Sequence, residues 1–172
     1  KVLELKGYIR DVPDFPEPGI LFKDITPMLA NPQAFGLAID SLEGLFKVVD
    51  FDVIVAVESR GFLFGAPLAD RLKKPIIPVR KPGKLPAATH ATEYALEYGT
   101  NTMEIHVDGI SKNDRVLLLD DLLATGGTLA AAARLVEISG GIIVGTGVVI
   151  ELLDLNGRKG LEGYNVKSLI FS

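Results

Sequence analysis

Short apolar runs alternate with longer segments of helical periodicity along most of this chain. A strand that is buried on both faces of a parallel sheet carries such a run, because neither face meets water. The runs that predict strands are FDVIVAV (51–57), PIIPVR (75–80), RVLLLD (115–120), IIVGTGVVIEL (142–152) and VKSLIF (166–171). The pattern therefore predicts five strands, separated by segments long enough for helices.

Helical spacing fills the intervals between these runs. Residues 60–72 and 128–139 show it, and Asn31 followed by Pro32 is typical of the start of a helix that runs to about Phe46. Alternating strands and helices predict an α/β domain with a mostly parallel central sheet flanked by helices. Ligands bind such sheets at the carboxyl ends of the strands, where the loops after Val57 and Leu119 are expected.

Two segments break the rhythm. Residues 81–101 contain proline, glycine and little core signal, so we expect a lid or binding loop without firm structure, with at most a loose ribbon at ATEYALEY. Residues 13–28 include FPEPGILFKD, in which two prolines stiffen a turn and the apolar side chains follow no strand or helix pattern. This second segment is either a loop attached to the core or part of a binding site.

Size and composition limit the classes of function that this chain can have. The 172 residues suit one domain, 48% of them are hydrophobic, and the net charge of -4 argues against a nucleic-acid partner. No apolar stretch approaches the roughly 18 residues of a membrane helix. The chain has no cysteine, which excludes disulfides and thiolate catalysis and fits a cytoplasmic protein. Two separate histidines do not suggest a metal site.

The loop that follows the run 115–120 combines two opposite chemistries. Asp120 and Asp121 can accept hydrogen bonds from vicinal hydroxyls, whereas a glycine-rich turn at the start of a helix binds anions through its backbone N–H groups. The turn residues are Ala124, Thr125, Gly126, Gly127 and Thr128. A ribose 5-phosphate requires both chemistries. The alternative is a solvated strand end followed by a capped helix.

A second loop, ESRGF, follows the run 51–57. Glu58, Ser59 and Arg60 stand at the start of a helix, and the planar, permanently charged Arg60 beside backbone donors indicates a pyrophosphate site. The alternative is a helix start that Ser59 merely caps. Arg80 and Lys84, in VRKPGKLP, are either solvated charges or further anion contacts at the entry to the lid.

These motifs carry a family resemblance. The thirteen residues VLLLDDLLATGGT (116–128) resemble, without a gap, the signature that type I phosphoribosyltransferases use to bind 5-phosphoribosyl 1-pyrophosphate (PRPP). DFPEPGILFKDITPML, VESRGFLFG, VRKPGKLP, YALEYGT and MEIH resemble the branch that acts on adenine, in its order and spacing. The resemblance implies the type I phosphoribosyltransferase fold, with a small hood and a flexible lid, and transfer of the phosphoribosyl group from PRPP to adenine, giving AMP and pyrophosphate.

The resemblance also implies roles for individual residues. The ribose and its 5-phosphate would be held by Asp120, Asp121 and the turn residues Ala124 to Thr128, and a non-proline cis peptide would join Glu58 to Ser59. Pyrophosphate would be bound by Glu58, Ser59, Arg60, Arg80 and Lys84, adenine by Leu21, Phe22, Lys23 and Leu152, and catalysis would fall to Glu97 with Tyr98. The family often has arginine in place of Lys23 and charged residues in place of residues 87–92, so the role of His90 stays open.

Magnesium is the cofactor that the resemblance implies. PRPP would carry the ion through its hydroxyls and pyrophosphate oxygens, with no direct protein ligand. A homodimer, and no nucleic-acid or membrane partner, are further expectations. Two alternatives stand beside adenine transfer: a phosphoribosyltransferase for another purine base, and a PRPP-binding regulator without catalysis.

Overall fold

The computed structural model describes residues 4–95 and 99–172. The chain folds as two compact units, Lys1–Ser41 and Leu42–Ser172, and the boundary falls inside helix α2 (Pro32–Leu45). Asn31 caps this helix as predicted, since its Oδ1 accepts a hydrogen bond from the Ala34 N–H at 3.0 Å. The single domain of residues 1–172 expected from chain length stays a prediction.

The first unit contains regular structure that the sequence pattern did not predict. Strands β1 (Arg10–Pro13) and β2 (Leu21–Asp24) form an antiparallel hairpin, preceded by the 3-10 helix η1 (Leu5–Tyr8) and followed by α1 (Thr26–Ala30). Strand β2 lies within residues 15–24, whose apolar side chains follow no strand or helix pattern in the sequence. The strands have four residues each and β2 shows no alternation of buried and exposed positions, so a period-2 signal had no length in which to appear.

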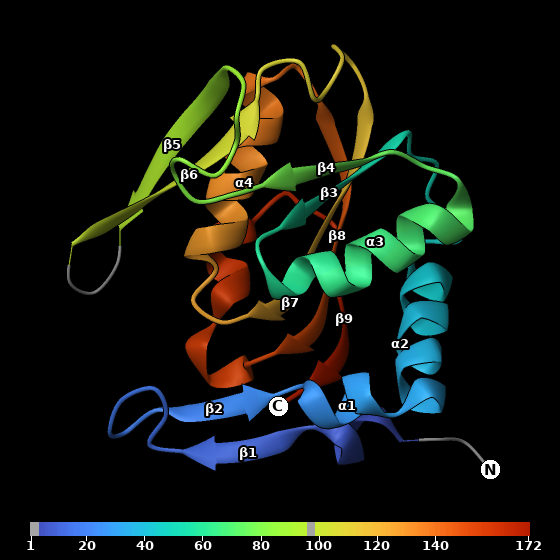
Figure 1. Ribbon diagram of the computed structural model, residues 1–172, viewed down its shortest axis with the longest axis vertical. Helices are drawn as coiled ribbons and strands as arrows, with labels where there is room; N and C mark the ends of the chain where they lie inside the picture. The colour runs from blue at the N-terminus through green and yellow to red at the C-terminus, as the bar shows by residue number, and fades with distance from the viewer. Residues whose placement is uncertain (1–3, 96–98) are drawn as a thin grey trace. The chain divides into compact units, whose positions relative to one another are not determined.

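The second unit is built on a five-stranded sheet in which every described pair is parallel (Figure 1). The strand order is β4 (Ile76–Val79), β3 (Val53–Val57), β7 (Arg115–Leu123), β8 (Ile142–Glu151) and β9 (Val166–Phe171). The five predicted strands and the α/β class are thereby confirmed. The largest boundary difference is in β7, which continues to Leu123, three residues beyond the predicted end at Asp120.

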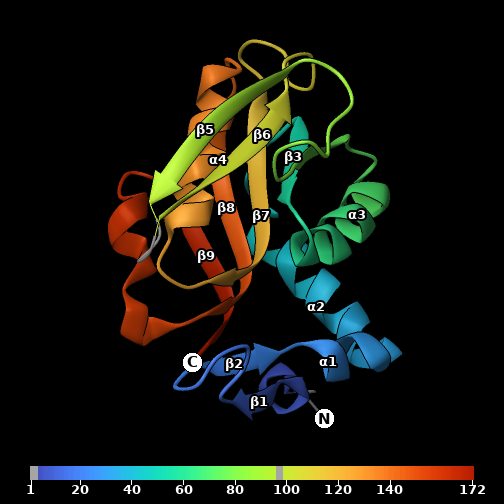
Figure 2. The same cartoon turned by 60° about the vertical axis from the view of Figure 1, so that its left-hand side comes forward.

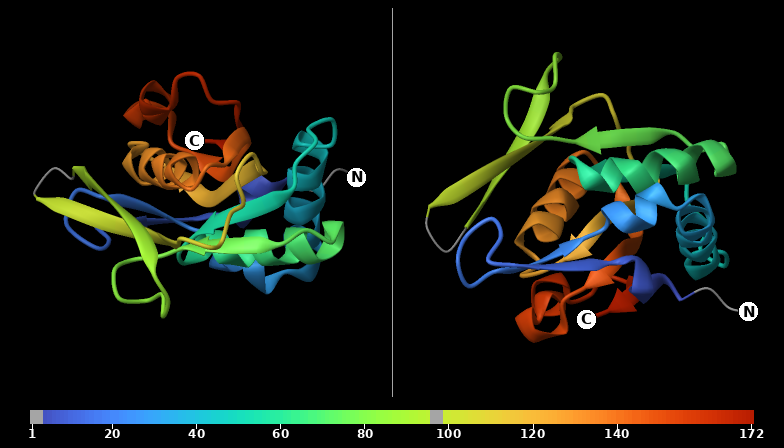
Figure 3. Two further views of the ribbon diagram at one scale, coloured as in Figure 1. Left: turned by 90° about the horizontal axis from the view of Figure 1, so that it is seen from above. Right: turned by 60° about the horizontal axis from the view of Figure 1, so that its bottom comes forward.

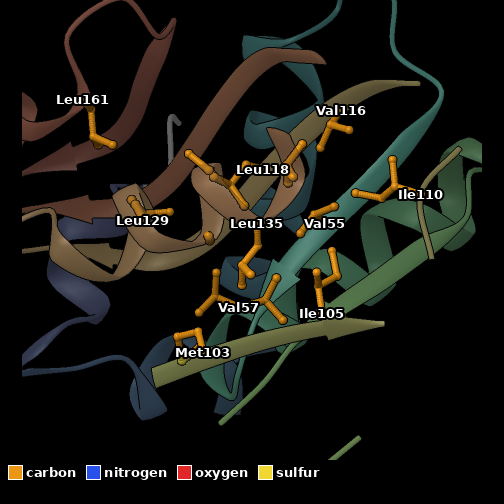
Figure 4. Packing of buried hydrophobic residues seen from close by; sticks show 14 of the residues in the cluster. Val55, Val57, Met103, Ile105, Ile110, Val116, Leu118, Leu129, Leu135 and Leu161 are labelled. Atoms are coloured by element: carbon orange, nitrogen blue, oxygen red, sulfur yellow. The ribbon is translucent and has the colours of Figure 1, made fainter. Parts of the chain in front are cut away.

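Helices α3 (Arg60–Leu72) and α4 (Gly127–Ile138) cover opposite faces of this sheet (Figure 3). Successive residues of a strand point to opposite faces. Val55 therefore packs in the apolar cluster with Leu135 of α4 (Figure 4), whereas Ala56 meets α3 at Gly65, where a Cβ atom would lie only 2.8 Å from the Ala56 Cβ. The sheet thus has a buried core on each side.

Two glycines of β8 explain a motif that resembles half of a dinucleotide fingerprint. A Cβ atom on Gly145 or on Gly147 would lie within 3 Å of the Phe46 ring. Both residues leave room for that ring on the face of the strand. Close packing against this ring therefore accounts for both glycines of the GTG sequence, which lies inside a strand.

The predicted lid segment is more regular than expected. Strands β5 (Thr89–Ala95) and β6 (Thr100–His106) pair antiparallel over seven positions, so the expectation of a span without firm structure is wrong. This β-ribbon lies along α4 (Figure 2), where the Arg134 Nη2 donates to the Glu93 carbonyl at 3.1 Å. Its strands are only partly buried, so they lack the apolar runs that revealed the central sheet.

The chain between the last two strands contains two short 3-10 helices, η2 (Leu153–Leu155) and η3 (Gly157–Leu161). Across residues 4–95 and 99–172, every helix is too short or too polar to cross a membrane.

Candidate active site

A cavity of about 350 Å³ opens in the second unit, where the carboxyl ends of β3 and β7 meet the start of α4. Its size lies within the range of about 300–1,000 Å³ that is usual for small-molecule sites. The residues that line it are Glu58, Ser59, Arg60, Lys81, Asp120, Asp121, Leu122, Leu123, Ala124, Thr125, Gly126, Thr128 and Leu129. Both loops singled out in the sequence therefore contribute to one cavity, as the parallel sheet predicts.

The two carboxylates of the cavity are buried. Asp120 is 8% exposed and Asp121 is 7% exposed, because β7 continues past both residues to Leu123. The alternative of a solvated strand end is therefore wrong. Charged groups are rarely buried without a partner or a function.

Asp121, the second of these carboxylates, contacts the cation Arg60. The Arg60 Nε donates to the Asp121 Oδ2 at 2.6 Å, and the Asp121 N–H donates to the Asp120 Oδ1 at 2.8 Å. Burial raises the pKa of Asp120 well above its usual range, and the neighbouring charge of Asp121 adds to this rise. A ligand that brings hydroxyl donors or positive charge to Asp120 would reduce the cost of ionising it.

The start of α4 offers the opposite chemistry. Gly126 is the N-cap residue with a φ of 90°, a conformation that favours glycine, and within the described chain no side chain caps this helix. The first helical N–H groups have no acceptor inside the helix, and the helix dipole makes this end positive. Thr128 and Leu129 line the cavity, so these donors stand at its wall. Gly127 faces Tyr94 instead: a Cβ atom added to Gly127 would lie 3.4 Å from the Cδ2 atom of Tyr94.

Glu58 has a structural partner as well as a place in the cavity wall. The Arg80 Nε donates to its Oε1 at 3.1 Å, and the Lys81 N–H donates to the same oxygen at 2.9 Å. Burial opposes ionisation of Glu58, but the Lys81 N–H and the Arg80 charge outweigh it and lower the pKa of this carboxyl. Glu58 thus ties the end of β3 to the segment that follows β4.

The cationic residues of the wall are Arg60 and Lys81. Lys81 belongs to the basic run VRKPGKLP, but the resemblance assigned the anion contacts to Arg80 and Lys84, which are not among the lining residues. Ser59 stands at the N-cap of α3 without a capping side-chain bond. The peptide that joins Glu58 to Ser59 is cis, which confirms that part of the prediction.

Leu21, Phe22 and Lys23 belong to the β1–β2 hairpin of the first unit. In that hairpin the Phe22 ring packs edge-on against Phe15 at 5.2 Å, and the Lys23 Nζ lies 2.8 Å from the Asp11 carboxylate.

Three other predictions concern the second unit. Leu152 follows β8, and its N–H donates to the Leu123 carbonyl at 2.9 Å, so it lies next to the end of the strand that carries the carboxylates. Glu97 and Tyr98 lie outside the described residues.

The donor chemistry of the cavity fits a magnesium ion that arrives on a ligand. No group of three or more His, Cys, Asp or Glu side chains that could hold a metal ion occurs among the described residues. Asp120 and Asp121 nevertheless supply hard carboxylate oxygens to the cavity, and magnesium is commonly bound by one or two carboxylates together with substrate phosphates.

Comparison with known proteins shows the family to which this chain belongs. Residues 30–170 match the model of the phosphoribosyl transferase domain. An adenine phosphoribosyltransferase from Halothermothrix orenii is 56% identical over 168 residues, which cover 98% of this chain and 99% of the relative. The enzyme of the same name from Gloeobacter violaceus is 56% identical over 169 residues, covering 98% and 99% of the two chains.

Solved structures agree in the fold. An adenine phosphoribosyltransferase from Thermoanaerobacter pseudethanolicus superposes with a TM-score of 0.96 and 54% identity, covering 98% of each chain. The enzyme from Saccharomyces cerevisiae, solved with adenine and an imino-altritol bisphosphate, gives a TM-score of 0.90 at 42% identity and covers 96% of each chain.

Proposed function

Because the chain belongs to the phosphoribosyl transferase family, and within it to the adenine phosphoribosyltransferases, we propose that it transfers the 5-phosphoribosyl group of PRPP to adenine, forming AMP and pyrophosphate. The observation that carries this proposal is the juxtaposition of Asp120 and Asp121 with the turn before α4 in one cavity. Vicinal hydroxyls and a phosphate monoester on one small molecule would use both.

The ribose 5-phosphate binds across these two elements. The backbone N–H groups of the turn and the hydroxyls of Thr125 and Thr128 bind the 5-phosphate, because they are donors at the positive end of a helix. Asp120 and Asp121 accept hydrogen bonds from the ribose hydroxyls. This contact also places negative charge beside the ring on which positive charge develops.

The pyrophosphate group lies toward the loop after β3. Arg60 and Lys81 supply positive charge at the cavity wall, and the backbone around Ser59 supplies N–H donors. Arg80 and Lys84 are proposed to contact the same group. Arg80 would do so while it donates its hydrogen bond to Glu58. Stabilising the leaving pyrophosphate is the main catalytic demand, because the bond from ribose C1 to the pyrophosphate oxygen breaks.

The family resemblance assigns adenine to Leu21, Phe22 and Lys23 of the β1–β2 hairpin and to Leu152. The Lys23 side chain is engaged by Asp11, which leaves the main chain near Leu21 and Lys23 as the reader of the exocyclic amine. Phe22 and Leu152 would cover the two faces of the base.

The chemical step is glycosyl transfer. N9 of adenine bonds to C1 of the ribose as the pyrophosphate oxygen takes the electron pair of the breaking bond, with positive charge on the ribose in between. The proton of N9 passes to Glu97, which lies in the segment that joins β5 to β6, and Tyr98 helps to exclude water. Bound magnesium, carried by PRPP, would neutralise charge on the pyrophosphate.

Two further assignments stay predictions. The homodimer rests on the family resemblance and is to be checked by light scattering. The cytoplasmic location rests on the absence of cysteine and is to be checked by fractionation.

A base panel tests the proposed function. Adenine, hypoxanthine, guanine and xanthine are each incubated with Mg-PRPP and followed by absorbance. We expect adenine to be preferred by about 10⁴-fold, because a site that accepts an amine N–H leaves an acceptor unpaired against a 6-oxo base. Comparable turnover of hypoxanthine would overturn the hood assignment. Binding of PRPP without turnover of any base would favour a regulator.

A further inference from the structure

The strand β8 ends on a buried glutamate that the proposed chemistry does not use. Glu151 is 4% exposed and accepts hydrogen bonds from the Arg158 Nε and Nη2 at 2.9–3.0 Å and from the Ser168 Oγ at 2.6 Å. The Arg158 Nη1 also donates to the Val166 carbonyl at 2.9 Å. Arg158 is therefore fixed to two strands of the sheet, β8 and β9.

The residue before this arginine lies directly behind the phosphate-binding turn. A Cβ atom on Gly157 would stand 2.4 Å from the Ala124 carbonyl oxygen, and a Cβ on Gly126 would stand 2.4 Å from the Gly157 carbonyl oxygen. Two backbones thus approach each other with no room for a side chain on either. The contact is reciprocal, so a shift of Gly157 must be transmitted to the turn.

Arg158 and Gly157 are neighbours, which links the two observations. The ion pair holds Arg158 on the sheet, Gly157 directly precedes it in the chain, and the Gly157 backbone lies against the turn at Ala124 and Gly126. We propose that Arg158, anchored on Glu151, is a positioning residue for the 5-phosphate of PRPP, acting through the backbone contact of Gly157 with the phosphate turn. This inference rests on the proposed function of the site.

A clasp that only stabilises the fold would behave differently from a positioning device. Loss of a structural clasp lowers the unfolding temperature but leaves the folded protein with its usual affinity for ligands. Loss of a positioning contact changes the affinity for PRPP in the folded protein. Calorimetric titration with PRPP, and KM for PRPP against KM for adenine, separate these outcomes.

The first test displaces the turn through the backbone contact. Gly157→Ala places a methyl group against the Ala124 carbonyl, and Gly160→Ala, in the same 3-10 helix, has open space around its Cβ and serves as the matched control. We expect Gly157→Ala to weaken PRPP binding about 10²-fold, the scale of a misplacement near 1 Å. KM for adenine and the affinity of Gly160→Ala for PRPP should stay within two- to three-fold of wild type.

The second test weakens the anchor. Arg158→Lys loses the bidentate geometry while keeping the charge, and Arg115→Lys makes the same change in the arginine–aspartate contact at the other end of the sheet. Both variants should melt at lower temperature. Only Arg158→Lys should raise KM for PRPP, by about 10-fold, with a smaller change in kcat.

The possible outcomes are distinct. If wild type binds PRPP and Gly157→Ala binds it equally well, this inference is wrong and the proposed function stands. Equal rises in KM for Arg158→Lys and Arg115→Lys would also overturn the inference, because the effect would be general loosening. Absence of PRPP binding by the wild type would overturn the proposed function and this inference with it.

Discussion

Two arginine–aspartate contacts stand at opposite ends of the neighbouring strands β3 and β7. At the amino ends, Arg115 donates to Asp52 and to Asp50, and its side chain and that of Asp52 are about 40% exposed. At the carboxyl ends, Arg60 donates to Asp121, whose side chain is 9% exposed, and Asp120 lies buried beside it. The residue types are the same, but the two ends differ in burial.

The pKa values show what this difference means. Hydrogen bonds from Arg115 lower the pKa of Asp52 to about 2, so the folded protein stabilises the ionised form of this carboxylate. Burial raises the pKa of Asp120, so the folded protein penalises its ionised form. The amino ends carry an exposed ion pair, whereas the carboxyl ends carry a buried carboxylate whose ionisation is unfavourable. An unfavourable buried carboxylate of this kind is typical of a ligand-binding site.

Binding at the carboxyl end should be separable from the chemical step, and this carries the largest expected effect. Glu97→Gln keeps size and polarity but removes the group that we propose takes the N9 proton. We expect the single-turnover rate constant to fall about 10²–10⁴-fold, the usual range for a lost general base. Affinity for PRPP should stay within a few-fold of wild type. A single-turnover rate equal to wild type would leave Glu97 as part of the lid only.

Asp120→Asn should produce opposite changes in binding and stability. One charge-assisted hydrogen bond is worth about 1.5–3 kcal/mol, so affinity for PRPP should fall roughly 10–10²-fold. The folded-state pKa of Asp120 is raised, so its contribution to stability is present at low pH and is lost as pH rises through that pKa. Removing the charge should therefore raise the melting temperature at pH 7, with the difference shrinking in acid. A lower melting temperature of Asp120→Asn at pH 7 would contradict the claim that the buried charge of Asp120 destabilises the fold.

Asp52→Asn should have the smallest effect and the opposite sign. The folded-state pKa of Asp52 is depressed from 3.8 to about 2, so its contribution is present above pH 4 and is lost as pH falls toward 2. Exposed ion pairs contribute little, so we expect a slightly lower urea midpoint at pH 6 that converges with wild type near pH 2. Affinity for PRPP should not change. A pH-independent difference would argue against the ion pair as its source.

The central sheet could be predicted from the sequence because its strands are buried on both faces. Each strand therefore contains a continuous run of apolar residues. Because we expected buried strands to be apolar throughout, we placed the end of β7 too early. Asp120 and Asp121 interrupt the apolar run and suggested that the strand stops there. Polar residues inside a buried strand violate the local pattern, and we propose that these two do so because they bind the ligand. That violation was itself the signal for the ligand.

Elements with partial burial gave weaker signals. The β5–β6 ribbon and the β1–β2 hairpin each have one or more exposed faces and short or mixed runs, so they seemed to be loops. The contact of Arg80 with Glu58, and the place of Lys81 in the cavity wall, depend on pairing between β3 and β4 and on the path of the chain beyond them. No spacing within the sequence reports such a contact.

Calorimetric titration of two double variants with PRPP tests most directly whether the carboxyl end, and not the charge type, makes the site. Asp120→Ala with Asp121→Ala should weaken PRPP binding about 10²–10⁴-fold, since two charge-assisted hydrogen bonds are lost. Asp50→Ala with Asp52→Ala should bind PRPP as the wild type does. If the first variant, folded by circular dichroism, retained wild-type affinity, the assignment of the ribose to this pair of carboxylates would be contradicted.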